Sequence, residues 1–267
     1  MESSPFPSSP DTLVTSDRWI DKFERQAQLN PGQTAVISGD RSLTYGELSA
    51  FSNQIANHLR ASGIGRGNFV GLGLHRCLEL PAALLGILKS GAAYLPLDPG
   101  YPAARISQMI ASSKIEFVVT KQELADRFPH VSAICIDGDT LANTSKEDPA
   151  LSVGENDFMY AIFTSGSTGQ PKAASVFHRG FQNLLHWYSI ELMLGPCDRT
   201  LVISSPSFDL TQKNFFAPLI TGGTLILDGC QTYDISRITG LIREHGITLI
   251  NCTPSAFYPL VDAAARS

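Results

Sequence analysis

The densest set of polar residues in the chain is the run Thr164-Ser-Gly-Ser-Thr-Gly169, which follows an apolar strand pattern over residues 158–163 and precedes Lys172. Its glycines let the backbone turn several N–H groups toward one point, an arrangement that binds oxyanions. Its hydroxyl groups and the lysine ammonium add donors and positive charge for the same anion. This order of strand, glycine-rich loop and lysine predicts a polyphosphate-binding loop. The residues that we expect to bind phosphate are Thr164, Ser165, Gly166, Ser167, Thr168, Gly169 and Lys172.

The loop is not a Walker P-loop, because that motif places Ser or Thr directly after its lysine and Ala173 follows Lys172 here. The alternative to a binding loop is a Ser- and Gly-rich surface loop without a ligand. A second glycine cluster, residues 63–67, follows a helical pattern rather than a strand. It therefore ends that helix and does not form a dinucleotide-binding fingerprint.

The run from Thr164 to Lys172 resembles the phosphate loop of the adenylate-forming, AMP-binding enzymes, and among them the adenylation domains of nonribosomal peptide synthetases. Other segments resemble motifs of these domains in the same order, and the resemblance covers residues 16–267. They are residues 43–48 (Leu-Thr-Tyr-Gly-Glu-Leu), 88–102 (with Leu-Pro-Leu-Asp at 95–98), 178–180 (His-Arg-Gly), 207–210 (Ser-Phe-Asp-Leu) and 251–255 (Asn-Cys-Thr-Pro-Ser). The chain is identified as a member of this family, similar to the N-terminal part of an adenylation domain.

The resemblance implies amino-acid activation. In the family, the substrate carboxylate attacks the α-phosphorus of Mg-ATP, which gives an aminoacyl-AMP and pyrophosphate. The acyl group then moves to the phosphopantetheine thiol of a peptidyl carrier protein, in a synthetase that also contains condensation domains. ATP and Mg²⁺ are the expected cofactors, with the Mg²⁺ ligands mostly outside this chain. Lys172 and Thr168 are the expected catalytic residues, which would hold the leaving phosphates.

The segment around Asp209 is the expected substrate site, because an aspartate at this position of the family pairs with the α-amino group of the substrate. The expected substrate-binding residues are Phe208, Asp209, Leu210, Lys213 and Asn251. A buried lysine is costly without a partner, so we expect the substrate side chain to be acidic, as in Glu or Asp, or an amide such as Gln. The alternatives are that Asp209 caps a surface helix and that Lys213 turns to solvent.

The sequence departs from the family pattern at some positions. Ala173 replaces the usual Gly after the loop lysine, and Thr211 and Asn214 stand where relatives often carry Ser and Glu. The later family motifs, which contact adenine, ribose and Mg²⁺ and supply a catalytic lysine, do not occur in these 267 residues. We therefore expect this chain to be inactive alone.

Two other functions stay open. One is a non-catalytic nucleotide-binding remnant that kept the fold and lost the chemistry. The other is an acyl-CoA synthetase-like ligase, which shares the phosphate loop. The Asp209 motif and residues 95–98 argue against this ligase, because a fatty acyl substrate has no amino group to pair with a carboxylate.

Composition and charge exclude several other classes of protein. The 20 Lys and Arg residues stand against 25 Asp and Glu without a basic run, so we expect no nucleic-acid partner. The five cysteines form no Cys-x-x-Cys pair and the six histidines no ligand pair, so we expect no metal site within the chain and reduced thiols. Neither a signal-peptide pattern nor an apolar run of membrane-spanning length is present, so we expect a cytoplasmic protein without a membrane partner.

Apolar strand patterns alternate with amphipathic helix patterns along the chain. Such alternation predicts an α/β fold with two mostly parallel sheets covered by helices, as in the large N-terminal domain of adenylate-forming enzymes. We expect a disordered tail over residues 1–15, a first subdomain over 16–150, and an incomplete second subdomain with the phosphate loop over 151–267. The expected strands are 33–38, 69–74, 93–97, 116–120, 132–136, 158–163, 200–203, 224–227 and 247–251. The main expected helices begin near residues 19, 44, 78, 102, 178, 213, 234 and 255.

Overall fold

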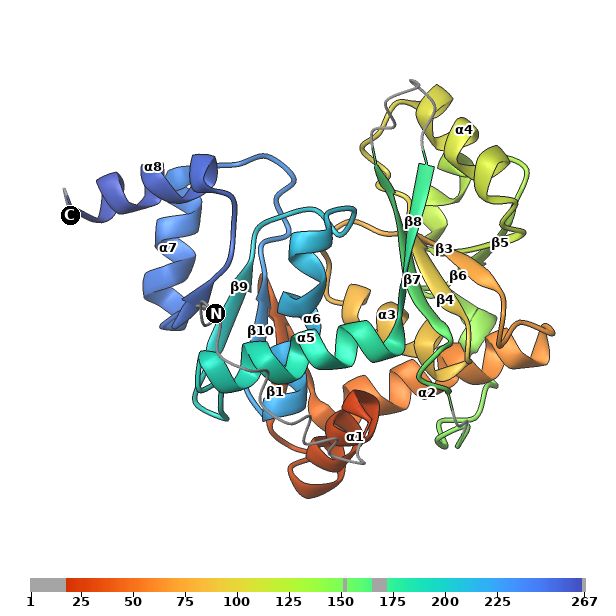
Figure 1. Cartoon of the computed structure of the whole chain (residues 1–267), viewed down its shortest axis with the longest axis horizontal. Coiled ribbons are helices and arrows are strands. Elements are labelled where there is room, and N and C mark those ends of the chain that lie inside the picture. Colours follow the sequence, from red (N-terminus) through yellow and green to blue (C-terminus); the bar gives the residue numbers. More distant parts are fainter. Residues whose placement is uncertain (1–17, 151–152, 165–171, 266–267) are drawn as a thin grey trace, which may run out of the picture.

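A computed structural model of the chain describes residues 18–150, 153–164 and 172–265 (Figure 1). The expected N-terminal tail and phosphate-loop residues 165–169 lie outside the described residues. Within the described part, strands form two sheets with helices between and around them, so the expected α/β class is confirmed.

The first sheet, sheet A, has the strand order β11-β9-β10-β1-β2. All neighbours pair in parallel except the hairpin of β1 and β2. Apolar β-branched residues and leucine fill its central strands, which suits strands that are covered on both faces. The strands are β1 (Thr34–Ser38), β2 (Arg41–Thr44), β9 (Arg199–Val202), β10 (Thr224–Leu227) and β11 (Leu249–Ile250).

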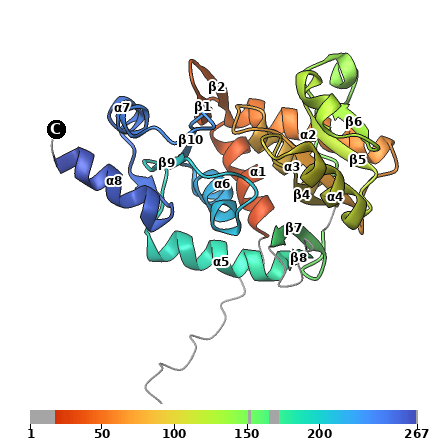
Figure 2. The same cartoon turned by 90° about the horizontal axis from the view of Figure 1, so that it is seen from above.

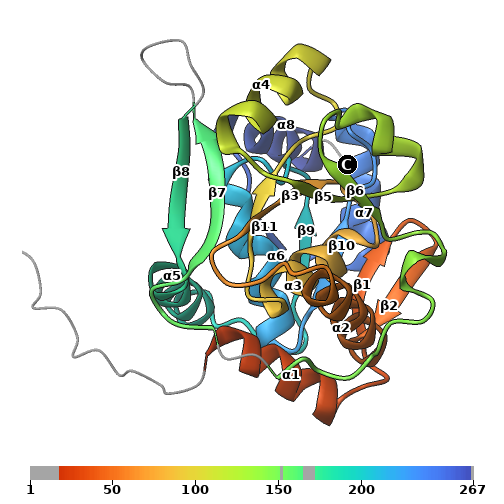
Figure 3. The same ribbon diagram turned by 90° about the vertical axis from the view of Figure 1, so that its right-hand side faces the viewer.

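The second sheet, sheet B, has the order β6-β5-β3-β4-β7-β8. Only β7 and β8 pair antiparallel, and Figure 3 shows β8 at the outer edge of the sheet. The strands are β3 (Phe69–Gly73), β4 (Ala93–Pro96), β5 (Phe117–Thr120), β6 (Ser132–Cys135), β7 (Phe158–Thr164) and β8 (Lys172–Phe177).

Helices α3 and α6 lie between the two sheets (Figures 1 and 2). Every residue of α3 is buried, as expected of a helix that is apolar on all sides. The helices are α1 (Trp19–Leu29), α2 (Tyr45–Ala61), α3 (Leu80–Lys89), α4 (Ala103–Ser113), α5 (His178–Glu191), α6 (Asp209–Thr221), α7 (Ile235–His245) and α8 (Pro254–Ala265), with 3₁₀ turns η1 (Gln122–Arg127) and η2 (Asp139–Leu141).

Most of the expected elements occur with bounds shifted by a few residues. The predicted start of α2 is confirmed as a capping box, in which Thr44 Oγ1 accepts from the Glu47 N–H at 3.2 Å and the Thr44 N–H donates to Glu47 Oε2 at 2.8 Å. Strands β2 and β8 were not predicted. The predicted start of α6 near residue 213 is wrong, because the helix begins at Asp209 and therefore includes the expected amine-binding carboxylate in its first turn.

Strand pairing crosses residue 150 in both sheets. Strand β1 lies between β2 and β10, and β7 joins β4. The expected subdomain boundary at residue 150 therefore does not separate the two sheets, because each sheet contains strands from both sides of it.

The segment between β3 and α3 ties the two sheets together. Buried Arg76 donates through Nε to Asp228 O at 2.9 Å, just beyond β10. Glu79 pairs with Arg41 on β2 and with Lys121 after β5, both at 2.8 Å. Burial alone would raise the pKa of Glu79, but the hydrogen bonds and charges of these cations outweigh it and lower the pKa to about 2.

Candidate functional site

The hairpin of β7 and β8 brings two of the expected phosphate-binding residues together. Thr164 and Lys172 lie opposite each other at the end of the hairpin where residues 165–171 connect the two strands, and Thr164 Oγ1 donates to Lys172 O at 3.3 Å. The Lys172 side chain is exposed, which leaves its ammonium accessible to an anion. The described ends of the loop therefore suit a phosphate group. The other expected members, Ser165 to Gly169, lie outside the described residues.

Asp209 is the first residue of α6, and it contacts β7 of the other sheet. Tyr160 Oη donates to Asp209 Oδ1 at 2.7 Å. Burial and this hydrogen bond to a carboxylate both raise the pKa of Tyr160, so its phenol remains a donor. One oxygen of Asp209 is thus held by a fixed donor, and the exposed carboxylate keeps its second oxygen for another partner.

A second buried tyrosine supports the same turn. The rings of Tyr94 and Tyr160 stack with centroids 5.5 Å apart, and Tyr94 Oη donates to Gln212 Oε1 at 2.6 Å. Gln212 Nε2 in turn donates to Pro206 O at 2.6 Å and to Phe208 O at 2.9 Å. The backbone before Asp209 is therefore fixed from sheet B. Sequence reasoning missed these residues, although a buried tyrosine generally requires a partner for its hydroxyl.

Lys213 and Asn251 meet at Tyr188 of α5. Lys213 Nζ lies 5.4 Å from the centre of the Tyr188 ring and donates to Leu210 O at 3.0 Å. Asn251 Nδ2 donates to Tyr188 Oη at 3.2 Å. Burial lowers the pKa of Lys213, and the charge of Asp209 opposes this shift. Lys213 is thus half-buried over a ring and does not extend into solvent.

Four of the expected substrate-binding residues are brought together by one arrangement of elements. Asp209, Leu210 and Lys213 lie in the first turns of α6, which follows β9, and Asn251 follows β11, the neighbour of β9. Open parallel sheets bind ligands beyond these carboxyl ends of their strands. The side chain of the fifth residue, Phe208, is 59% exposed and packs into no core.

Strand β7 connects the two expected sites. Thr164 at the phosphate loop lies four residues beyond Tyr160, the partner of Asp209, and this separation is about 14 Å at ~3.4 Å per residue.

Comparison with protein families places this geometry in context. A family model described as AMP-binding enzyme matches residues 23–267. The chain belongs to this AMP-binding enzyme family.

This AMP-binding enzyme chain is similar to parts of large peptide synthetases. It is 37% identical over 257 residues to surfactin synthase subunit 2 of Bacillus subtilis (strain 168), covering 95% of this chain and 7% of the synthase. It is 37% identical over 231 residues to tyrocidine synthase 2 of Brevibacillus parabrevis, covering 86% of this chain and 6% of that protein. The chain thus spans less than a tenth of the length of these relatives.

Solved structures give the same assignment. The nonribosomal peptide synthetase FmoA3 matches with a TM-score of 0.88 and 29% identity over 94% of this chain and 27% of the FmoA3 chain. A second FmoA3 structure, described as an AMPPNP-bound form, matches with a TM-score of 0.87 and 30% identity, covering 94% and 27% of the two chains. The fold of the AMP-binding chain is therefore that of the large N-terminal domain of a synthetase adenylation domain.

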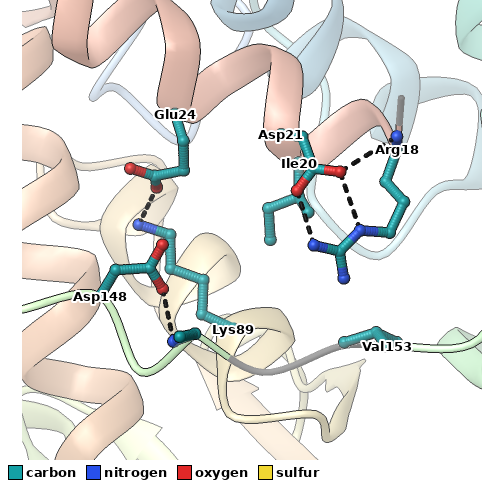
Figure 4. Close-up of a pocket in the computed structure, with 8 residues that line it drawn as sticks. Arg18, Ile20, Asp21, Glu24, Lys89, Asp148 and Val153 are labelled. Atoms are coloured by element: carbon teal, nitrogen blue, oxygen red, sulfur yellow. Dashed lines mark hydrogen bonds and ion pairs between the residues drawn. The ribbon is translucent and has the colours of Figure 1, made fainter. Parts of the chain in front are cut away.

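A separate cavity, about 250 Å³ in volume, lies beside α1 (Figure 4). None of the expected site residues lines it. Its charged groups are largely paired with one another, since Arg18 binds Asp21 and buried Lys89 binds Glu24. Its lining residues are Arg18, Ile20, Asp21, Glu24, Lys89, Asp148, Ala150 and Val153.

The described part of the chain holds neither a metal cluster nor a membrane span. No group of three or more His, Cys, Asp and Glu side chains there could hold a metal ion. No helix in the same residues is long and apolar enough to span a membrane. The five cysteines are free.

Proposed function

We propose that the chain takes part in ATP-dependent adenylation of an amino acid, which forms an aminoacyl-AMP and pyrophosphate. The contact between Tyr160 and Asp209 carries the proposal, because it holds a carboxylate at the ligand-binding end of sheet A with one oxygen left for an ammonium group. Membership of the AMP-binding family supports the use of ATP.

The proposed chemistry is mainly positioning and charge neutralisation. Asp209 pairs with the α-amino group of the substrate and so directs its carboxylate toward the phosphate loop. Lys172 and Thr168 hold the β- and γ-phosphates, which are the leaving group, together with Thr164, Ser165, Gly166, Ser167 and Gly169. Mg²⁺ would accompany ATP and neutralise phosphate charge. The described residues offer no carboxylate cluster for it, so we assign no ligand.

The similarity to synthetases suggests the next step and its partners. We infer that the acyl group passes to the phosphopantetheine thiol of a peptidyl carrier protein, and that condensation domains use it in nonribosomal peptide synthesis. We infer a cytoplasmic location for the reaction, in line with the five free cysteines, since thiols stay reduced there.

Exchange of labelled pyrophosphate into ATP tests the proposal. The assay uses the full-length natural protein that carries these 267 residues and a panel of amino acids and fatty acids. We expect exchange with an amino acid, and its loss in Asp209→Ala. Exchange with fatty acids alone would support an acyl-CoA synthetase-like ligase, and nucleotide binding without any exchange would support a non-catalytic remnant.

A further inference from the structure

A chain of hydrogen bonds connects the first turn of α6 to the end of β11. Asn214 Nδ2 donates to Leu210 O at 3.3 Å, and Asn214 Oδ1 accepts from Tyr188 Oη at 2.9 Å. Tyr188 Oη in turn accepts from Asn251 Nδ2 at 3.2 Å. Asn214 is 1% exposed, so its side-chain amide is shielded from water and depends on these protein partners for its hydrogen bonds.

The direction of these hydrogen bonds follows from which atoms can donate and which can only accept. The carbonyl of Leu210 can only accept, so the NH₂ group of Asn214 must face it and the Asn214 oxygen must face Tyr188. A phenol has one proton, and Tyr188 gives it to Asn214. Tyr188 can therefore only accept from Asn251, which fixes the NH₂ group of Asn251 on the phenol. The Asn251 Oδ1 atom makes no hydrogen bond within the described part of the chain.

Lys213 places donors at the same ring. Its ammonium uses one proton on Leu210 O and lies over the Tyr188 ring, so two protons remain for a ligand. The surroundings of Tyr188 therefore combine a cationic donor at Lys213 with a neutral acceptor at Asn251.

We propose that Tyr188 sets the polarity of the side-chain pocket and that the amino-acid substrate carries a side-chain carboxamide, as in glutamine or asparagine. This inference rests on the proposed function and on the expectation that Lys213 and Asn251 line the side-chain pocket. A carboxamide oxygen accepts from Lys213 while its NH₂ group donates to Asn251 Oδ1. A carboxylate also pairs with Lys213, but its second oxygen meets the Asn251 oxygen, and neither atom has a proton to share.

The test compares kcat/KM in pyrophosphate exchange for L-glutamine against L-glutamate and for L-asparagine against L-aspartate, in the full-length natural protein. We expect the better amide to exceed its matching acid by about tenfold or more, because a site built for a donor rejects an analogue without one. Tyr188→Phe should reduce this ratio at least fivefold, since Asn251 is then free to turn. Trp187→Phe, at an exposed ring of the same helix, should keep the ratio.

A wild-type preference for the acids, or for leucine or phenylalanine, overturns the carboxamide assignment even if Tyr188→Phe does not fold. A wild-type preference for the amide that is unchanged in a folded Tyr188→Phe protein overturns the role of Tyr188. Absence of exchange with every amino acid contradicts the proposed function, and this inference is then rejected with it.

Discussion

At the scale of single residues, Tyr160 connects the strand of the proposed phosphate site with the proposed binding site for the substrate amine. It lies on β7, the strand that runs into the phosphate loop, and its hydroxyl binds the carboxylate expected to hold the substrate amine. A hydrogen bond to a charged group contributes about 1.5–3 kcal/mol. We therefore expect Tyr160 to act as a positioning residue for Asp209.

Removal of this hydroxyl should weaken amino-acid binding and leave ATP binding intact. We expect Tyr160→Phe to raise KM for the amino acid about tenfold or more, since one hydrogen bond to a carboxylate is lost, with KM for ATP unchanged. Tyr45→Phe is the matched control, because it removes a buried hydroxyl that binds Pro218 O and Gly223 O, at the end of α6 away from Asp209. Equal effects of the two variants on both KM values would show a general structural role.

The phosphate loop gives a complementary prediction. The double variant Lys172→Ala with Thr168→Ala should raise KM for ATP, because it removes a cation and a hydroxyl donor to phosphate. Lys146→Ala, at an exposed lysine outside the site, should have no effect. Wild-type ATP affinity in the double variant would show that the loop does not bind phosphate.

The site residues that the sequence predicts are those with a local signal. The spacing of glycines, hydroxyls and lysine predicts the loop, and the resemblance of the Phe-Asp-Leu motif predicts Asp209. Tyr160, Tyr94 and Tyr188 could not be predicted, because their contacts depend on distant partners. Tyr160 contacts Asp209 across 49 residues and Tyr94 contacts Gln212 across 118. Such pairs form only when the two sheets enclose α6.

At the scale of helices, a buried ion pair fixes α1 against α3. Lys89 Nζ binds Glu24 and donates to Ser52 Oγ and Asn53 Oδ1 of α2, both at 2.7 Å. Its side chain is only 3% exposed. The lysine of the 88–102 motif therefore has a structural role that its sequence context did not indicate.

Breaking this pair should destabilise the fold. We expect Lys89→Met to lower the free energy of unfolding by about 3 kcal/mol, because the Glu24 carboxylate, whose side chain is only 16% exposed, then loses its counterion. The double variant Glu24→Leu with Lys89→Met should be less destabilised than Lys89→Met alone, since it buries no unpaired charge. Urea denaturation followed by circular dichroism measures both. A double variant no more stable than Lys89→Met would contradict this account.

His178 at the start of α5 gives the fold a dependence on pH. Burial lowers the pKa of His178 to about 4, and its Nδ1 accepts from Trp19 Nε1 at 3.3 Å. Its contribution to stability is thus fully present above the unfolded pKa near 6.5 and is lost as pH falls toward 4.

Comparison with a matched variant isolates this contribution. Between pH 7.5 and 4.5 we expect the wild-type chain to lose roughly 2.5 kcal/mol more stability than His178→Gln, whose amide can still accept from Trp19 and does not titrate. Urea denaturation at the two pH values measures the difference. Equal losses in the two proteins would mean that protonation of His178 does not oppose folding.

Elements with an apolar period were predicted well, and those without one were missed. Strand β8 contains Lys, two Ala and Ser, all exposed, so it has no alternation and is defined by its pairing with β7. Helix α6 buries Thr211, Gln212 and Asn214. These polar residues hide the helical period in the sequence, and their hydrogen bonds to Ser204, Tyr94 and Tyr188 make their burial possible.

At the scale of the whole molecule, the described residues contain the proposed amine site and the two ends of the phosphate loop. The family motifs that contact adenine, ribose and Mg²⁺ do not occur in the 267 residues. We therefore expect the 267-residue chain by itself to give no amino-acid-dependent pyrophosphate exchange. The full-length natural protein is the comparison in the same assay. Exchange by the chain alone would overturn this expectation.

The pairing of β1 with β10 also delays the completion of sheet A while the chain is being synthesised. Thr224, at the start of β10, bonds to Thr34 O of β1 across 190 residues of sequence. At a synthesis rate of ~5–20 residues per second, β1 leaves the ribosome about 10–40 s before its parallel partner. During this interval β1 and β2 form only a two-stranded hairpin, which is marginally stable in water. The nascent chain therefore presents an unpaired, apolar strand edge throughout this interval, when chaperone binding would protect it.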